Sequence, residues 1–244
     1  MENIIEVKGI RKVYRVGNEK VIALEKIDLS IAKGEICCLL GTSGSGKSTL
    51  LNLMAGLEKP TKGEIIIKNI HVEKLDEKRL VLFRQKYIGF VFQSYNLLPN
   101  LTAQENVGLP LAFKGISKKV RDKKSKQMLN SVGLTTHSNR KPSQMSGGQQ
   151  QRVGIARAFV GNPEIVFADE PTGNLDSKTT TEVMNLITDI ARKNKQTLII
   201  VTHDLNIARY ADRIIHILDG NIEKIETLTP TGDQNKYESI KLGG

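Results

Sequence analysis

Short apolar runs alternate with amphipathic stretches along most of the chain. Several runs are almost continuously apolar, which is typical of strands covered on both faces of a largely parallel sheet. Helical patterns lie between them, so the sequence predicts an α/β fold. The runs predicted to form strands are Ile4–Val7, Ile22–Ile31, Glu35–Leu40, Glu64–Lys68, Ile88–Phe92, Ile165–Ala168, Thr197–Val201, Ile214–Leu218 and Asn221–Ile225.

Residues 102–160 interrupt this alternation. They show several helical patterns and no convincing strand, while strands are predicted on both sides of them. This block is therefore predicted to be a helical lobe inserted into an α/β core. From Thr227 onward the chain is polar and loses its periodicity. That last segment is predicted to be a loose tail or a small addition to the domain.

The size and composition of the chain fit one α/β domain with an attached lobe. The 244 residues are 39% hydrophobic, which is enough for a sizeable core. No stretch is predicted to span a membrane, and the N-terminus lacks a targeting pattern. Cys37 and Cys38 are adjacent in a predicted strand, where neighbouring side chains point to opposite faces. A disulfide or metal site is therefore not expected, and a reducing cytosol is favoured.

The chain carries a formal net charge of +10, and part of this charge is concentrated in one stretch. Residues 114–127 hold many lysines and one acid, Asp122. A solvated helix face is the simplest interpretation of this stretch, and an anionic membrane surface or nucleic acid is the alternative. Nucleic acid is the weaker alternative because the chain has no recognised nucleic-acid module and only 5% aromatic residues.

A glycine-rich loop follows the run EICCLL and precedes a helical pattern. Its sequence, GTSGSGKST, satisfies G-x-x-x-x-G-K-[ST] in the required strand–loop–helix context. The glycines let successive N–H groups converge on phosphate oxygens at the positive end of a helix. Lys47 is predicted to neutralise the β- and γ-phosphates, and the Ser48 hydroxyl to bind Mg²⁺. The predicted ATP-binding residues of the loop are Gly41, Thr42, Ser43, Gly44, Ser45, Gly46, Lys47, Ser48 and Thr49.

Three further polar residues follow apolar runs at the expected ligand-binding edge of the sheet. Asp169 and Glu170 end one run, and the carboxyl ends of core strands are where α/β sheets bind ligands. Asp169 is predicted to join the Mg²⁺ shell, and Glu170 to polarise a water for attack on the γ-phosphate. His203 follows another run and is predicted to contact the γ-phosphate. Alone, these residues would be an ordinary turn and a surface histidine. The other histidines, His71, His137 and His216, are predicted to be incidental.

Residues 146–152 read SGGQQQR and precede an apolar helical pattern, VGIARAFV. Locally, this is a capped helix start. The stretch also resembles the signature motif of the ATP-binding cassette (ABC) ATPases, and the other motifs occur in that family's order: the phosphate loop, Gln93 in FVFQSYNLLP, SGGQQQR, the Asp–Glu strand, GNLDS and His203.

Three stretches narrow the resemblance to the lipoprotein-releasing and macrolide-efflux (LolD/MacB) branch. They are QSYNLLPNLTAQENV, SGGQQQRVGIARA and DEPTGNLDS. Thr42 replaces the usual proline of the loop, and Met145 replaces the leucine before SGGQ; both replacements are expected to be tolerated.

The resemblance implies a fold and a division into parts. The implied fold is a P-loop NTPase (RecA-like) core with a largely parallel sheet, an antiparallel β subdomain and an inserted α-helical subdomain. One ABC ATPase domain is expected over residues 1–226. Residues 1–92 and 162–226 would form the core with its β subdomain, residues 93–161 the Q-loop and helical signature subdomain, and residues 227–244 a C-terminal tail.

The resemblance also implies roles for residues outside the phosphate loop. Two such domains pair head to tail, and each signature faces the partner's phosphate loop. Tyr14 would stack on adenine, Gln93 would contact Mg²⁺ or the attacking water, and Asp176 of the D-loop would couple the two sites. The signature residues expected to act on the partner's γ-phosphate are Ser146, Gly147, Gly148 and Gln149.

The implied function is that of an ATPase subunit that powers export or extraction through separate membrane permease subunits. Its cofactors would be ATP and Mg²⁺, and its second cassette an identical or a different chain. It would lie at the cytoplasmic face of the membrane, docked through the Gln93 loop and the helical lobe, with Leu97, Leu98 and Pro99 contributing. The alternatives are a regulatory or mechanotransmitting ATPase of the cell-division type and an ABC ATPase that acts on nucleic acid. A nucleic-acid partner is not expected.

Overall fold

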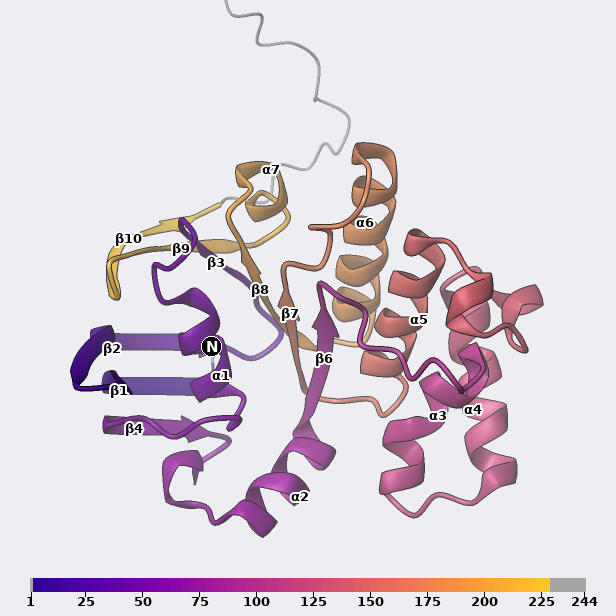
Figure 1. Cartoon of the computed structure of the whole chain (residues 1–244), viewed down its shortest axis with the longest axis horizontal. Helices are drawn as coiled ribbons and strands as arrows, with labels where there is room; N and C mark the ends of the chain where they lie inside the picture. The colour runs from indigo at the N-terminus through magenta and orange to yellow at the C-terminus, as the bar shows by residue number, and fades with distance from the viewer. Residues whose placement is uncertain (1, 229–244) are drawn as a thin grey trace, which may run out of the picture.

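The computed structural model of the protein describes residues 2–228, which contain two β-sheets and the helices that pack on them (Figure 1). The smaller sheet is antiparallel. A long hairpin, in which Val16 pairs with Glu19 across the turn, contributes its first two strands. The order of strands across this sheet is β2 (Glu19–Ala32), β1 (Asn3–Val16), β4 (Lys62–Ile67) and β5 (Ile70–His71).

The larger sheet is parallel except at one edge, where β10 pairs antiparallel with β9. Its central strands are buried along their whole length, as the apolar runs predict. The order of strands across this sheet is β10 (Asn221–Thr227), β9 (Arg213–Leu218), β3 (Ile36–Leu40), β8 (Thr197–Thr202), β7 (Ile165–Asp169) and β6 (Ile88–Phe92).

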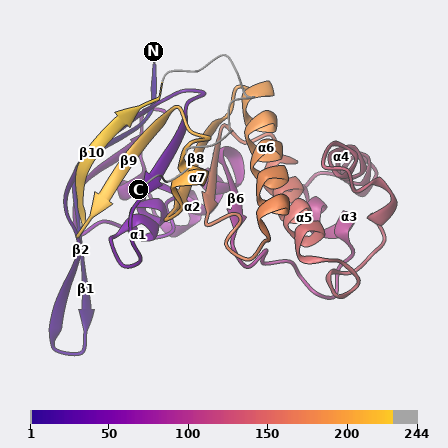
Figure 2. The same cartoon turned by 90° about the horizontal axis from the view of Figure 1, so that it is seen from above.

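The larger sheet separates two hydrophobic cores. Alternate residues of each strand point to opposite faces, so Cys37 belongs to the core shared with the antiparallel sheet and α1 (Lys47–Met54). Cys38 belongs to the other core, on which α5 (Gly147–Phe159) and α6 (Ser177–Lys193) pack together with α3 (Ala103–Phe113) and α4 (Lys118–Ser131). Figure 2 shows α5 and α6 on one side of the larger sheet and the hairpin of β1 and β2 extending away on the other. Both thiols are free and buried, as the predicted alternation requires.

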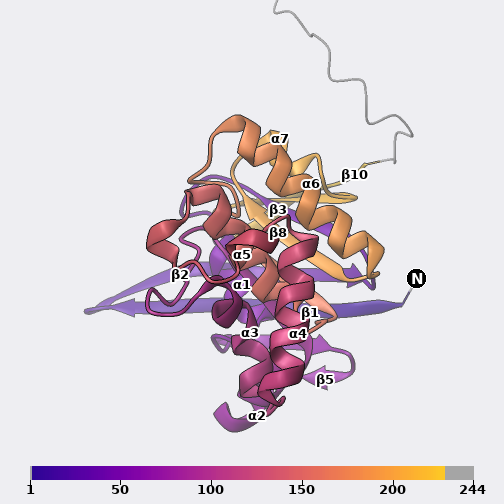
Figure 3. The same ribbon diagram turned by 90° about the vertical axis from the view of Figure 1, so that its right-hand side faces the viewer.

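Three helices lie together at one end of the molecule, beside the larger sheet (Figure 3). They are α3 (Ala103–Phe113), α4 (Lys118–Ser131) and α5 (Gly147–Phe159). They lie between β6 and β7 in the chain, so a helical insertion into an α/β core is confirmed. The remaining helices are α2 (Glu77–Tyr87), α6 (Ser177–Lys193), α7 (Leu205–Ala208) and three short 3-10 turns, Val72–Lys74, Thr135–His137 and Pro142–Gln144.

The predicted strands differ from the observed ones mainly in the hairpin. The pattern predicts Ile4–Val7, whereas β1 continues to Val16. Its distal part is partly exposed on both faces, so it lacks the alternation that marks a half-buried strand. The predicted tail also begins too early, because Thr227 ends β10 and Leu228 packs against the core. The rest of the predicted tail, residues 229–244, lies outside the described residues. Across residues 2–228, none of the helices combines the length and apolar character that a membrane span needs.

Candidate functional site

The glycine-rich loop connects β3 to α1 and holds a buried lysine. Gly46 precedes α1 with φ 105°, and a Cβ there would lie 2.6 Å from the carbonyl oxygen of Ala23. Only glycine fits this close approach. Lys47 is 6% exposed, and its Nζ donates to the carbonyl oxygen of Thr42 at 2.7 Å. Burial lowers the pKa of Lys47. A buried ammonium whose hydrogen-bonding partner is a neutral carbonyl is well suited to an incoming anion.

This loop forms one side of a cavity of about 410 Å³. The opposite side is formed by residues that lie far away in the sequence, at the ends of other strands of the larger sheet. The cavity therefore brings together many of the predicted site residues. Its lining consists of Ala23, Ser43, Gly44, Gly46, Lys47, Ser48, Thr49, Gln93, Glu170 and His203.

Some predicted residues of the loop support the cavity without lining it. Ser45 is buried, and its hydroxyl has no hydrogen-bonding partner. Gly41 lies against β9, where a Cβ would approach the carbonyl oxygen of Ile217 to 2.2 Å. Asp169 lies behind Ser48, whose hydroxyl donates to Asp169 Oδ1 at 3.4 Å. Burial raises the pKa of Asp169, and the neighbouring Glu170 adds to this shift. A desolvated carboxyl beside a second carboxylate and a hydroxyl offers oxygen ligands of the kind that Mg²⁺ takes.

Glu170 follows β7 directly and points toward the end of β8. Its Oε1 lies 2.9 Å from Nδ1 of His203, and its Oε2 accepts a hydrogen bond from the Thr202 hydroxyl at 3.4 Å. The backbone of Glu170 has φ 45°, a left-handed conformation that is strained for a residue with a side chain. Its N–H donates to the carbonyl oxygen of Val201 at 2.9 Å. The neighbouring strand therefore holds Glu170 in this conformation and aims its carboxylate into the cavity.

Gln93 follows β6, and residues that the sequence analysis did not identify hold its loop. The Asn174 amide donates to the carbonyl oxygen of Gln93 at 3.1 Å. The guanidinium of Arg157, on α5, donates to the carbonyl oxygens of Tyr95 and Asn96. Asn174 lies within the GNLDS loop, so a signal for its role was present. Arg157 likewise lies within SGGQQQRVGIARA, whereas for Ala23, in the cavity wall, the sequence pattern offered no such signal.

The signature residues lie outside the cavity of their own chain. Ser146 precedes α5 as its N-cap: its hydroxyl accepts from the N–H of Gln149 at 3.3 Å, and its own N–H donates to Gln149 Oε1 at 3.1 Å. The helix-capping interpretation is therefore correct. Asp176 caps α6 in the same way through Thr179, whose hydroxyl lowers the pKa of Asp176. Within residues 2–228, the cavity lining includes neither the signature nor Asp176.

Tyr14 lies on β1, near the cavity but not in its lining. Its hydroxyl donates to Glu58 Oε2 at 2.7 Å, and Lys12 Nζ lies 4.8 Å from the centre of its ring. The pKa of Tyr14 is raised by burial and by its bond to Glu58, while a contact with Thr49 opposes the shift. The contact with Thr49 places Tyr14 next to the phosphate loop.

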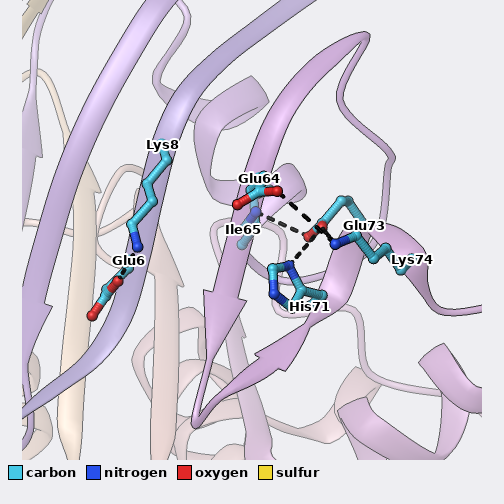
Figure 4. Close-up of polar contacts among 7 residues, drawn as sticks. All are labelled: Glu6, Lys8, Glu64, Ile65, His71, Glu73 and Lys74. Atoms are coloured by element: carbon cyan, nitrogen blue, oxygen red, sulfur yellow. Dashed lines mark hydrogen bonds and ion pairs between the residues drawn. The ribbon is translucent and has the colours of Figure 1, made fainter.

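A second polar cluster lies at β4, β5 and the 3-10 turn that follows them (Figure 4), and none of its residues lines this cavity. One oxygen or nitrogen atom of each of Glu64, His71 and Glu73 lies within 4.8 Å of the others. Lys74 Nζ stands 3.9 Å from both carboxylates, and the N–H of Ile65 donates to Glu73. The cluster therefore already contains its own compensating charge. His71 does not belong to the cavity lining.

Comparisons with known proteins agree with the fold and the site. Residues 24–173 match the ABC transporter family. An uncharacterised ABC transporter ATP-binding protein of Methanocaldococcus jannaschii, MJ0796, is 46% identical over 95% of this chain and 100% of its own length. YtrE of Bacillus subtilis, an ABC transporter ATP-binding protein, is 47% identical over 89% of this chain and 96% of its own. A MacB macrolide export ATP-binding/permease protein of Aeromonas hydrophila is 43% identical over 91% of this chain and 34% of its own length.

A solved structure shows the same architecture. The ATP-binding cassette MJ0796, as a dimer in a post-hydrolysis state bound to ADP and Pi, has a TM-score of 0.86 at 46% identity, covering 92% of this chain and 99% of the solved chain. These findings confirm the P-loop NTPase fold, ATP as the nucleotide, ATPase activity and the likeness to the macrolide-efflux branch. The chain belongs to the ABC transporter family and is its ATP-binding cassette.

Proposed function

We propose that two copies of this cassette, or one copy and a similar chain, close head to tail around Mg·ATP and drive export or extraction through separate permease subunits. The observation that carries this proposal is that the residues expected to bind one nucleotide lie in two separate places on each chain. The cavity holds the phosphate loop, Gln93, Glu170 and His203 of one chain, while Ser146 lies on a helix outside it. The dimeric MJ0796 cassettes support the pairing.

Within one chain, each cavity residue has a chemical task. Lys47 binds the β- and γ-phosphate oxygens. Glu170 takes a proton from the attacking water, and His203 holds Glu170 and contacts the γ-phosphate. Ser48, Gln93 and Asp169 would hold Mg²⁺, which when bound neutralises charge on the phosphates. The hydroxyl of Ser48 already contacts Asp169.

In the partner chain, Ser146 and the following glycines meet the γ-phosphate. The N-cap hydroxyl and the free N–H groups at the start of α5 attract an anion. Since Ser146 is exposed, it is available to the facing chain. The γ-phosphate then links the two chains, and its loss on hydrolysis releases them. Asp176, exposed at the start of α6, would couple the two sites across the dimer.

The permease would dock beside the loop that follows Gln93. An apolar groove of about 220 Å³ lies there, between α2 and β6 on one side and α3 and α5 on the other. Arg157 lines this groove and also binds the carbonyl oxygens of Tyr95 and Asn96. A partner bound in the groove would therefore contact Arg157, and through it the loop that follows Gln93. Leu98, which is 48% exposed, would widen the contact.

Cross-linking tests the composite site. A chain with Ser43→Cys and Ser146→Cys in a Glu170→Gln background is treated with a short bifunctional maleimide, with and without Mg·ATP. We expect covalent dimers that require ATP, because residue 43 of one chain then faces residue 146 of the other. A matched control pairs Ser43→Cys with Ser131→Cys, at the end of α4. Cross-linking without ATP, or equally in the control, would overturn the head-to-tail arrangement.

A further inference from the structure

The outward face of α4 is a dense array of lysines. With 3.6 residues per turn, Lys119, Lys123 and Lys126 lie on one face, and Lys124 lies beside them with Val120. All five residues are exposed. The opposite side of the helix is buried through Ser125 and Leu129, which pack into the helical part of the core. We call Lys119, Val120, Lys123, Lys124 and Lys126 the α4 face.

No carboxylate neutralises this face. Asp122, the one acid in the helix, is half-buried on the inner side. Within residues 2–228, none of the four lysines has an oxygen of an acidic residue within 4.0 Å. The repulsion extends beyond the face, because Lys124 contributes, after burial, to the lowered pKa of Lys114. Unpaired like charges held this close destabilise the helix, so they are better explained by an external anionic partner than by stability.

The α4 face adjoins the groove that the permease would occupy. Phe113 and Lys114 line that groove, and the chain passes from them through a short turn into α4. Phe113 is 69% exposed and Val120 is 44% exposed. Figure 1 places α2 and the turn between α3 and α4 at the same lower end of the molecule. A cassette docked through the groove therefore turns this end toward the membrane.

We propose that the α4 face, with Phe113 at its edge, binds the headgroups of anionic phospholipids beside the permease. This inference rests on the proposed docking through the groove. Lysines on a helix are attracted to the negative cytoplasmic leaflet. Exposed apolar side chains among them add the contact with the headgroup boundary that peripheral helices use.

A nucleic-acid partner fits this surface less well. Single strands are bound in charged grooves with aromatic side chains on which bases stack. The α4 face is the surface of one helix and not a groove, and Phe113 at its edge is the one aromatic side chain that the proposed surface includes. Its lysines offer point charges of the kind that phosphate headgroups attract.

Sedimentation with vesicles tests the proposal on the full chain. We expect binding to phosphatidylcholine vesicles that contain roughly one third phosphatidylglycerol, no binding to phosphatidylcholine alone, and loss of binding between about 0.1 and 0.5 M salt. The variant Lys119→Glu/Lys123→Glu/Lys126→Glu should lose more than about 100-fold in partitioning, since the loss of each lysine alone costs about fivefold and the glutamates add repulsion. A milder variant with glutamine at these positions should show an intermediate loss.

A matched control separates the α4 face from total charge. Lys26→Glu/Lys33→Glu/Lys193→Glu changes three exposed lysines elsewhere and lowers the net charge equally. We expect this control to bind vesicles as the wild type does. An equal loss in both triple variants would overturn the proposal. So would displacement of the protein from anionic vesicles by a single-stranded RNA at equal phosphate concentration, which would indicate a nucleic-acid surface.

Fluorescence gives a second, local measurement, because the chain contains no tryptophan. Val120→Trp should shift its emission to the blue on anionic vesicles, whereas Ile225→Trp, exposed on β10, should not. A shift of both, or of neither, would overturn the proposal. ATP turnover of the α4 triple variant should equal that of the wild type. If cross-linking between residues 43 and 146 fails while vesicle binding persists, the dimer proposal fails and the lipid surface remains.

Discussion

The Glu170 carboxylate lies 2.9 Å from Nδ1 of His203, and the two residues follow neighbouring parallel strands, β7 and β8. The two residues are 33 positions apart in the chain, so no local sequence pattern brings them together. The sheet brings them together, and the left-handed backbone of Glu170 turns its side chain toward the cavity. This pair lines the same cavity as Lys47 of the phosphate loop.

Glu170→Gln should keep ATP binding and lose turnover. Removing a general base reduces the rate about 10²–10⁴-fold, equivalent to about 3–5 kcal/mol of barrier. Steady-state phosphate release measures the loss, and size-exclusion chromatography with Mg·ATP should show an accumulating dimer. Glu223→Gln, an exposed residue of β10, is the control and should behave as the wild type. Turnover near normal in Glu170→Gln would contradict the role assigned to Glu170.

Asp169→Asn should stabilise the nucleotide-free protein, and its ATP turnover should lose the normal dependence on Mg²⁺. The pKa of Asp169 is raised in the folded state, mainly by burial. The folded protein therefore binds more protons than the unfolded chain, and the contribution of Asp169 to stability falls as the pH rises through the window between the two pKa values. The asparagine variant lacks this penalty above that window and loses its advantage as the pH falls to the ordinary carboxyl range.

Urea denaturation over a range of pH checks this difference between the wild type and Asp169→Asn. The control is Asp189→Asn, at an exposed position of α6. A constant difference at all pH values would show that packing, and not the titration of Asp169, is responsible. Turnover in Asp169→Asn that still depends normally on Mg²⁺ would remove Asp169 from the metal site.

Tyr14 can be tested by comparing ligands with and without adenine. If Tyr14 stacks on the base, Tyr14→Ala should weaken ATP binding about fivefold, in line with about 1 kcal/mol for an aromatic pair. Binding of inorganic tripolyphosphate should not change. Tyr14→Phe keeps the ring and loses only the hydroxyl with its contacts to Glu58 and Thr49, so it should bind ATP as the wild type does. Equal weakening for both ligands would show that Tyr14 acts through the phosphate loop.

Arg157→Met should loosen the loop that follows Gln93. Its guanidinium bonds to the carbonyl oxygens of Tyr95 and Asn96, two residues held at positive φ. Losing bonds from a charged donor should reduce the free energy of unfolding by about 2 kcal/mol. Hydrogen exchange of residues 93–97 should rise more than exchange elsewhere.

Arg152→Met is the matched control for Arg157→Met, because it lies on the same helix and pairs with the exposed Glu182. Arg152 is partly buried and also donates to the carbonyl oxygen of Val132 at 3.3 Å, so its loss should cost up to about 2 kcal/mol but should leave the loop after Gln93 unchanged. Equal exchange of residues 93–97 in both variants would show that Arg157 does not hold this loop.

Most of the cavity could be predicted because its residues follow buried strands. Lys47 and Ser48 follow β3, Glu170 follows β7, and His203 follows β8; continuous apolar runs marked all three strands. Parallel strands place such ends at one edge of a sheet, so residues that follow apolar runs could be predicted to lie close together.

The remaining features depended on contacts that no local pattern contains. Ala23 reaches the cavity because β2 crosses above Gly46, and Arg157 meets Tyr95 across 62 positions of the chain. The exposed half of the β1–β2 hairpin lacked alternation because few of its side chains are buried. In each case tertiary packing, and not local preference, decides the outcome.

Side chains along β3 point alternately to the two faces of the larger sheet, and this has a practical consequence. Cys37 and Cys38, the only two cysteines of the chain, are each enclosed by a different core, and burial raises the pKa of Cys38 to about 12. The thiolate is the nucleophile that attacks thiol reagents, so neither buried sulfur competes with an introduced surface cysteine at neutral pH. The wild-type chain is therefore ready for site-specific spin labels or fluorophores without first replacing its own thiols.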